Sequence, residues 1–376
     1  MYSSIEGKLT ISTSDGHKTI TLVADDNKKI IIDDIELATL NYNETHLLSG
    51  EDNNERVIPL IIKSAKILNS EALFEEFNEN KELKKINITT KWSLKFIAIT
   101  VGGWLPAGMT PQNAHYLLDK NIFNILANRY TEGKIIEDIQ NDFFDLIHTE
   151  ELILNPSLFM LEGNNQSIKR TMSDIVDKFL ESEAIIKKAL PKAIIPETQE
   201  NLTKGVFGML EQLYDNNQKI LTFIQSTMSI LYKETAIKKR KDTVDQLKKM
   251  AIINGIRRES ILYIAVLSAA LSSPEQNYAK KILKPKPPKK YTLKDAYNAL
   301  SDIRALDYLM WAVALDPKVK TYLCTNDKNL VRFWCAIEPT NLKFQGNRLS
   351  YNLRFRQNLF KNLSDSEFDY VINSIK

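Results

Sequence analysis

The chain has 376 residues, which is enough for two or three domains, and its hydrophobic fraction of 43% and charged fraction of 26% are ordinary for a globular protein with a buried core. A net charge of +3 says nothing by itself about a partner. The two cysteines, Cys324 and Cys335, are too few for a disulfide framework, so we expect a reducing, cytoplasmic location.

Charge is unevenly distributed along the chain. Residues 231–290 contain fifteen Lys or Arg and five Asp or Glu, a local net charge of +10, which leaves about −7 for the rest. Such a region can bind a polyanion, or it can be the solvated surface of helices, and both interpretations stay open. The start, MYSSIEGKLT, does not have the pattern of a signal peptide. The longest apolar run, near Ile261–Leu271, is too short to span a bilayer, so we expect a buried helix and no membrane partner.

The N-terminal region has the period of β-strands. The segments LTIST, TITLVAD and KKIIID are separated by turn-prone residues and predict an antiparallel meander. A strand (IPLIIKSAKIL), a charged helix (SEALFEEFNENKELKK) and two more strands (KINITT, SLKFIAITV) are predicted next. The Gly- and Pro-rich GGWLPAGMTPQ then marks a boundary. We therefore place a β-rich N-terminal domain at residues 1–108.

The pattern after this boundary is mainly helical. Apolar residues at three- and four-residue spacing predict helices at Ile135–Ile147, Ser167–Ala189, Thr203–Lys233 and Thr243–Leu271. The Lys- and Pro-rich segment KPKPPKK at 284–290 predicts an exposed, extended loop.

Two short segments place acidic residues just beyond a strand. In AHYLLDKNIF an apolar run ends at Asp119, Asn121 follows, and a helix begins. In TYLCTNDKNL an apolar run ends at Thr325 and Asp327, again before a helix. The carboxyl ends of strands are where ligands bind in open α/β sheets, so both segments are candidates for a site.

Further acids lie between these segments. Pro156 predicts a helix start that puts Glu162 in the second turn, and Asp307 is predicted to open the apolar helix DYLMWAVAL. A carboxylate in an apolar setting needs a partner, and a divalent cation is one. Asp302 is a reserve for Asp307, and Glu259 competes with Glu162.

These segments resemble the PIN-domain nucleases. LLDKNIF is similar to the family's first strand, DYLMWAVAL to the helix with the third acid, and CTNDKNL to the strand end with the last acid. The resemblance implies four residues that are both metal ligands and catalytic, supported by Asn121 and Thr325. The four are Asp119, Glu162, Asp307 and Asp327.

The resemblance also implies a fold. It is an α/β, PIN-like parallel sheet at residues 109–376, with a large helical insertion at about 167–285, because Asp119 and Asp307 are 188 positions apart. The family's compact domain is shorter, and the resemblance covers about 109–166 and 295–335.

The expected activity is metal-dependent hydrolysis of a phosphodiester, in RNA rather than DNA. Hard oxygen ligands select Mg²⁺ or Mn²⁺, which can activate water and neutralise charge on a phosphate. We expect the basic region, through Lys238, Lys239, Arg240 and Lys241, to contact the nucleic-acid backbone. The resemblance further implies a toxin or phage-defence setting, and it leaves open an oligomer or a protein partner.

Two alternatives remain. The chain can be a non-catalytic nucleic-acid-binding protein on a decayed nuclease fold, or a helical scaffold whose acids are structural. Other sites are not indicated. The four histidines, at positions 17, 46, 115 and 148, lack metal-ligand spacing, and Cys324 is expected to be a core thiol.

Overall fold

The chain is seen here as a computed structural model, whose internal contacts divide it into two units. Unit 1 consists of Met1–Asn155, Glu183–Pro196 and Pro317–Asn326, and unit 2 of Pro156–Ser182, Glu197–Asp316 and Asp327–Lys376. The domain boundary expected near residue 108 stays a prediction. The structure describes residues 7–14, 17–24, 29–49, 55–70, 84–136, 139–162, 170–272, 277–346, 348–360 and 363–375.

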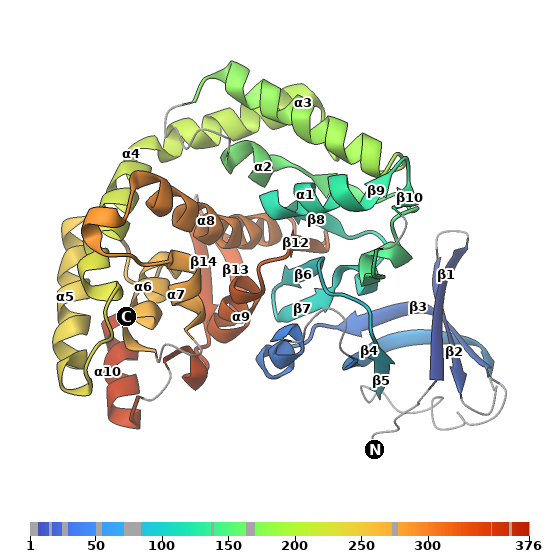
Figure 1. The fold of residues 1–376 in the computed structure, drawn as a ribbon, viewed down its shortest axis with the longest axis horizontal. Coiled ribbons are helices and arrows are strands. Elements are labelled where there is room, and N and C mark those ends of the chain that lie inside the picture. The colour runs from blue at the N-terminus through green and yellow to red at the C-terminus, as the bar shows by residue number, and fades with distance from the viewer. Residues whose placement is uncertain are drawn as a thin grey trace. The chain divides into compact units, whose positions relative to one another are not determined.

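Unit 1 begins with an antiparallel sheet of five strands in sequence order (Figure 1). The strands are β1 (Gly7–Ser14), β2 (His17–Ala24), β3 (Lys29–Ala38), β4 (Arg56–Ser70) and β5 (Lys84–Thr90). Each pairs antiparallel with the next, which confirms the predicted meander and the strands predicted at IPLIIKSAKIL and KINITT. The charged helix predicted between β4 and β5 covers residues 71–83, which lie outside the described part of the chain.

The second sheet of unit 1 is mixed. Its order is β11 (Ile153–Asn155), β8 (His115–Leu118), β12 (Thr321–Thr325), β6 (Ile97–Thr100) and β7 (Gly103–Pro106). Strands β11, β8 and β12 are parallel, whereas β6 is antiparallel to β12 and β7 to β6. The expectation of a parallel sheet at 109–376 holds for these three strands, but the sheet is mixed, because it also includes β6 and β7, which precede residue 109. The short turn at 101–102 reverses the chain and makes β7 antiparallel to β6.

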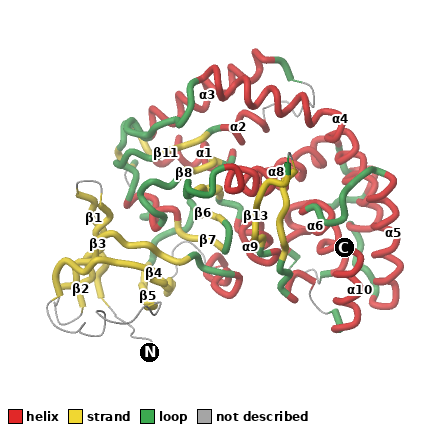
Figure 2. Tube along the Cα trace, turned by 180° about the vertical axis from the view of Figure 1, so that it is seen from behind, coloured by secondary structure: helices red, strands yellow, loops and turns green. Residues whose placement is uncertain are grey.

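The centre of this sheet is buried on both faces. All five residues of β12 are buried, which is why the segment reads as a continuous apolar run without alternation. Helix α1 (Lys120–Arg129) follows β8 directly and packs against β12. Seen from behind in Figure 2, the strands β6, β7, β8 and β11 lie together.

Unit 2 is mostly helical, and it also contains a two-stranded hairpin, β13 (Pro339–Gln345) and β14 (Arg348–Leu353). Helix α6 (Ile261–Leu271) has every residue buried and packs against α4, α5, α7 and α8, which confirms the predicted buried helix. None of the helices in the described residues is both apolar enough and long enough to cross a membrane. The other helices are α2 (Ser157–Glu162), α3 (Met172–Ala189, which runs into unit 1), α4 (Gln199–Leu231), α5 (Arg240–Ile253), α7 (Tyr278–Leu283), α8 (Leu293–Leu315), α9 (Lys328–Ile337) and α10 (Asp365–Ile375).

Three helix predictions need correction. The helix expected at 135–147 is wrong, because its described residues form the short strand β10 (Lys134–Ile135) and a 3-10 turn at Phe143–Leu146. The helix expected at 243–271 is two helices, since Gly255 has a φ of 66° that ends α5. Helix α8 starts at a capping box on Thr292, so Asp307 lies inside it and does not open it.

Gly103 allows the second sheet of unit 1 to approach the segment that follows β3. Its neighbour Trp104 exchanges backbone hydrogen bonds of 2.8 and 2.9 Å with Leu40, which follows β3. Gly103 has a φ of +146°, and an added Cβ would lie 1.9 Å from the carbonyl oxygen of Leu40. No side chain fits at this position.

We therefore expect Gly103→Ala to lower the free energy of unfolding by about 2 kcal/mol or more, from backbone strain and from loss of the Leu40 pairing. Gly205→Ala is the matched control. Gly205 lies in α4 with no atom within 4 Å of an added Cβ, so this change should raise stability by about 0.5–1 kcal/mol. Urea denaturation measures both. An unchanged midpoint for Gly103→Ala would contradict the assigned role.

Candidate functional site

Asp119 and Thr325 lie at the same edge of the mixed sheet. Asp119 directly follows β8, and Thr325 is the last residue of β12. The two strands are parallel with Leu118 opposite Cys324, so their carboxyl ends coincide. The amide of Asp119 extends this pairing by donating to the carbonyl of Cys324 at 3.0 Å. The sheet thereby joins residues from the two segments that the sequence singled out.

Several hydrogen bonds link these residues with Asn121. The Asp119 Oδ2 atom accepts from Asn121 Nδ2 and from the Thr325 hydroxyl, both at 2.6 Å. Asn121 Oδ1 in turn accepts from the backbone amide of Asn326 at 3.0 Å. We call Asp119, Asn121 and Thr325 the strand-end cluster. Sequence reasoning did not include Asn326, because its contribution is a backbone group.

The Asp119 side chain does not serve its own helix. An aspartate at a helix N-cap normally accepts a hydrogen bond from an amide of the first turn, which contributes about 1 kcal/mol. Asp119 is the N-cap of α1, yet its side chain accepts no such bond. Its carboxylate is turned to Thr325 on the neighbouring strand instead. The local stability of α1 therefore does not explain why an acid stands at this position.

The surroundings of the strand-end cluster hold the Asp119 carboxylate in a fixed orientation. Thr325 is fully buried and Asp119 is half-buried, so the hydroxyl is held in place while the carboxylate lies near the surface. Two short donors on one oxygen hold the carboxylate in a single orientation. Burial raises the pKa of the adjacent Cys324 thiol well above its usual value, and this agrees with the expected core thiol.

Asp327 is used differently from Asp119. It is the N-cap of α9, and its Oδ1 accepts from the amides of Asn329 at 2.8 Å and Leu330 at 3.1 Å. This is ordinary helix capping, strengthened by the helix dipole. Asp327 belongs to unit 2 and Asp119 to unit 1, and the metal-binding role of Asp327 stays a prediction.

Glu162 is the last residue of α2, in the second turn as expected. Its backbone carbonyl accepts from the Tyr297 hydroxyl at 3.2 Å, and the carbonyl of Leu161 accepts from the same hydroxyl at 3.3 Å. Arg170 donates to the carbonyls of Met160 and Leu161. Side chains of unit 2 thus cap the last carbonyl groups of α2. These contacts involve only the backbone of Glu162, so the role of its carboxylate stays a prediction.

Asp307 lies inside α8 and is exposed. The protein around it nevertheless hinders hydration of the carboxylate and raises its pKa, while Arg304 and Arg257 act in the opposite direction. Glu259, the competitor of Glu162, is engaged with Arg257, with a hydrogen bond of 2.8 Å to Nε.

Within the described ranges, no three His, Cys, Asp or Glu side chains lie close enough together to hold one metal ion. The four acids implied by the resemblance are divided between the units, with Asp119 in unit 1 and the other three in unit 2. The structure thus brings together Asp119, Asn121 and Thr325, which all belong to unit 1.

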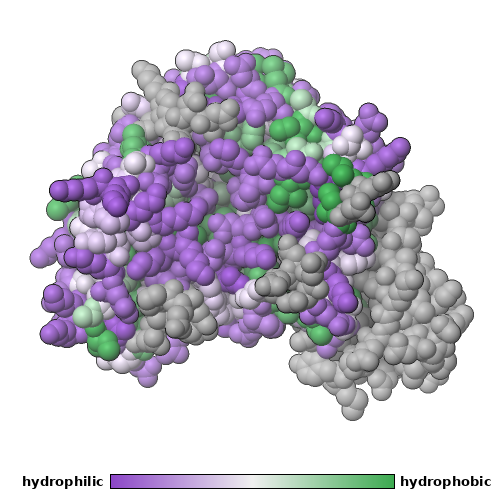
Figure 3. Space-filling model, viewed as in Figure 1, coloured by the Kyte–Doolittle hydropathy of each residue, from purple (hydrophilic) through white to green (hydrophobic). Residues whose placement is uncertain are grey.

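The basic run at Lys238–Lys241 is partly engaged within unit 2. Arg240 pairs with Glu367 of α10 at 3.2 Å, and the Lys241 ammonium lies 5.1 Å from the centre of the Tyr370 ring. Lys238 and Lys239 are exposed on a short 3-10 turn. Figure 3 shows that hydrophilic side chains cover most of one face of the described residues, with hydrophobic ones in small groups. Of the four basic residues, Arg240 and Lys241 contact α10, whereas no such contact is seen for Lys238 and Lys239 among the described residues.

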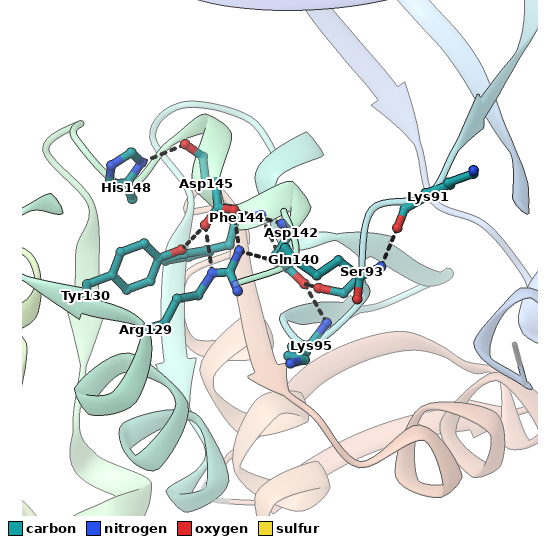
Figure 4. A network of polar contacts seen from close by, with 10 residues as sticks. All are labelled: Lys91, Ser93, Lys95, Arg129, Tyr130, Gln140, Asp142, Phe144, Asp145 and His148. Carbon is teal, nitrogen blue, oxygen red and sulfur yellow. Dashed lines mark hydrogen bonds and ion pairs between the residues drawn. The ribbon is translucent and has the colours of Figure 1, made fainter. Parts of the chain in front are cut away.

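A second polar network in unit 1 was not found from the sequence (Figure 4). Asp142 is fully buried; its Oδ2 accepts from the Ser93 hydroxyl at 2.6 Å and the Lys95 amide at 2.8 Å, and its Oδ1 accepts from the Phe144 amide at 3.0 Å. Burial raises its pKa to about 6, although these hydrogen bonds lower it. Asp142 thus ties the segment after β5 to the 3-10 turn.

The neighbouring Asp145 completes this network. It accepts from Arg129 Nε at 2.7 Å, from the Tyr130 hydroxyl at 2.6 Å and from the amide of Asp142 at 2.7 Å. His148 stacks on Tyr130 with ring centres 5.3 Å apart. Asp142 and Asp145 have the spacing of a capping box. This spacing is the one sequence signal that could have indicated a new helical start at residue 142 in place of the predicted helix. These contacts hold the 3-10 turn against the end of α1 and the start of β9, which is a structural role.

Comparison of the chain with known protein families, with curated proteins and with solved structures finds no match. The interpretation of the strand-end cluster therefore depends on its geometry and on the resemblance of its residues.

The buried Asp142 should make stability depend on pH. Its pKa is about 6 when folded and 3.8 in the reference state, so the folded protein binds this proton more tightly. The resulting stabilisation is complete below pH 3.8 and is lost as pH rises through about 6, by roughly 3 kcal/mol in total. Asp142→Asn lacks this titration. Urea unfolding between pH 4 and 8 should show wild type losing stability relative to the variant, whereas a constant difference would contradict the assignment.

Asp327 can be tested for a capping role alone. Asp327→Ala should cost about 1 kcal/mol because two amides lose their acceptor, whereas Asp327→Asn should cost a few tenths, since Asn also caps. If Asp327 in addition binds a cation, Mg²⁺ should raise the melting temperature of wild type more than that of Asp327→Asn. Equal responses to Mg²⁺ would leave capping as its function.

Proposed function

We propose that the chain is a Mg²⁺- or Mn²⁺-dependent nuclease that hydrolyses phosphodiester bonds, in RNA rather than DNA, with Asp119 anchoring the ion. The observation that carries the proposal is the hydrogen bonding of Asp119, whose carboxylate is oriented by Asn121 and Thr325 and is not used to cap α1. An acid held at the carboxyl end of a parallel strand is suited to bind a ligand.

The donor set fits a hard divalent cation. Carboxylate, amide and hydroxyl oxygens are the ligands that Mg²⁺ prefers, and Mg²⁺ often takes only one or two carboxylates and completes its shell with water and substrate phosphate. When bound, such an ion supplies an activated water and neutralises charge on the phosphate. Thr325 and Asn121 would fix the Asp119 carboxylate, as outer partners of a metal ligand do.

The other predicted acids enter the proposal as separate hypotheses. The resemblance to PIN-domain nucleases assigns Asp327, Glu162 and Asp307 to the same task, and it assigns a toxin or phage-defence setting to the protein. The parallel order β11–β8–β12, with Asp119 and Thr325 at adjacent strand ends, supports the resemblance without depending on these three acids.

A non-catalytic nucleic-acid-binding protein is the second candidate. One observation favours it, namely that no three acidic, His or Cys side chains of the described residues form a group around a metal ion. In this case the strand-end cluster would be a remnant that holds β8 and β12 together. Binding of RNA without hydrolysis in Mg²⁺ and in Mn²⁺ would distinguish this candidate from the nuclease.

The nuclease proposal predicts that Asp119→Asn reduces Mn²⁺-dependent cleavage of a labelled RNA by at least about a hundredfold, because the ion loses its charged anchor. Thr325→Val keeps the shape but removes the hydroxyl, so activity should fall about 10–100-fold, and Thr325→Ser should restore much of it. Glu132→Gln, an exposed acid of unit 1 in the turn after β9 (Tyr130–Thr131), is the control and should cleave like wild type.

Unfolding curves would accompany these assays, since loss of the Thr325 hydrogen bond also affects stability. Rescue by Ser but not by Val, with both variants folded, would support positioning of Asp119 by the hydroxyl. Cleavage by Asp119→Asn at the rate of wild type would rule out the assigned site.

A further inference from the structure

The hairpin of β13 and β14 has two chemically different faces. Its register places Lys343 opposite Ser350 and Gln345 opposite Arg348 on one face. The pair Phe344 and Leu349 lies between them on the other face. Lys343, Gln345 and Arg348 are exposed, whereas Phe344 and Leu349 are partly covered. We call the first the polar face of the hairpin.

The apolar face is fixed to α8, which packs against β13 (Figure 1). Phe344 meets Trp311 of α8 edge to face, with ring centres 5.9 Å apart, and Trp311 lies 6.3 Å from Tyr308. Trp311 is still 40% exposed, which is unusual for so large an apolar side chain. An exposed aromatic ring thus lies beside β13, on the face opposite to Lys343.

The polar face is basic and has few internal partners. No acidic residue occurs in the sequence between Glu338 and Asp365. Glu338 pairs with Arg356 at 2.9 Å and, at 4.0 Å, with Arg354. Among the residues that the structure describes, Lys343 and Arg348 make no ion pair. Their charge is therefore available to a polyanion.

This hairpin fits a nucleic acid better than the basic run at Lys238–Lys241 does. At Lys238–Lys241 two of the four cations already contact α10, through Glu367 and Tyr370. The hairpin instead combines uncompensated cations with the amide side chains of Gln345 and Asn352 and with an exposed indole. In such a set the cations can bind phosphates, the amides can bind base edges and the indole can stack on a base.

We propose that the hairpin binds single-stranded nucleic acid that passes from the polar face, around β13, to Trp311 on the opposite face. Lys343 and Arg348 contact phosphates, and Trp311 stacks on a base. A single strand is the partner because only unpaired bases can lie on an aromatic ring, whereas those of a duplex are already stacked. The inference deepens the proposed function by locating its substrate, yet it requires binding alone and no hydrolysis.

The test measures binding of a fluorescent single-stranded RNA to the full chain in EDTA over a series of salt concentrations. Lys343→Ala/Arg348→Ala should weaken binding and reduce the slope of log K against log salt by about 1.4, or 0.7 for each lost phosphate contact. Lys219→Ala/Lys294→Ala removes the same charge from exposed positions of α4 and α8 and should leave the slope near that of wild type.

Two further variants separate charge from shape. Lys343→Arg/Arg348→Lys retains both charges and should keep the slope. Trp311→Ala should weaken binding by about tenfold with the slope unchanged, because a stacking contact releases no counterions. A slope that is unchanged in Lys343→Ala/Arg348→Ala would overturn the proposal, as would tighter binding to duplex RNA or to anionic lipid vesicles than to the single strand.

The outcome is independent of the proposed catalysis. Loss of binding in the hairpin variants, when wild type binds RNA but cleaves none, would support the hairpin and refute the nuclease. Cleavage that depends on Asp119 but is untouched by the hairpin variants, with an unchanged salt slope, would support the nuclease and refute the hairpin.

Discussion

Strand β12 lies between β8 and β6, and its hydrogen bonds join segments whose paired residues are 206 positions apart in the sequence. Loop closure over such a length costs little more than over a shorter one, about 0.6 kcal/mol for each doubling. The pairing can therefore tolerate the long helical segment between the strands. It also creates the strand-end cluster, because Thr325 reaches Asp119 only when β12 is aligned with β8 in this register. A shift of one residue would turn Thr325 to the other face of the sheet.

The same constraint separates two acids that look alike in the sequence. Asp119 and Asp327 both stand between a strand and a helix, and both are N-caps. Asp327 uses its carboxylate for the amides of its own helix, whereas Asp119 has the hydroxyl of Thr325 beside it and points there. Loss of an N-cap hydrogen bond destabilises a helix by about 1 kcal/mol. The orientation of Asp119 therefore implies that its contact with Thr325 contributes more than this loss.

The sequence predicted the elements whose pattern is local, including the meander, the strands at His115–Leu118 and Thr321–Thr325 and the buried helix at Ile261–Leu271. It also predicted that Asn121 and Thr325 accompany Asp119. It did not predict the turn around Asp142, because a helical period and a capping box compete there and the buried contacts to Ser93 and Lys95 are not local. The start of α8 is earlier than the sequence predicted, because the prediction relied on the apolar run after Asp307 and not on the capping box at Thr292. Which acids share a site depends on tertiary distances, which periodicity does not contain.

The number of carboxylates near Asp119 bears on the kind of metal site that the proposal requires. Four acids in one cleft repel each other, and a pair 4 Å apart costs about 4 kcal/mol at an effective dielectric of 20. A single oriented carboxylate avoids that cost in the metal-free protein, at the expense of a weaker hold on the ion. Substrate phosphates would then supply part of the coordination shell, as they do for Mg²⁺ in general. In such a site the ion and the nucleic acid bind cooperatively, so affinity for the strand matters as much as affinity for the metal. A separate basic surface such as the hairpin of β13 and β14 would serve this need.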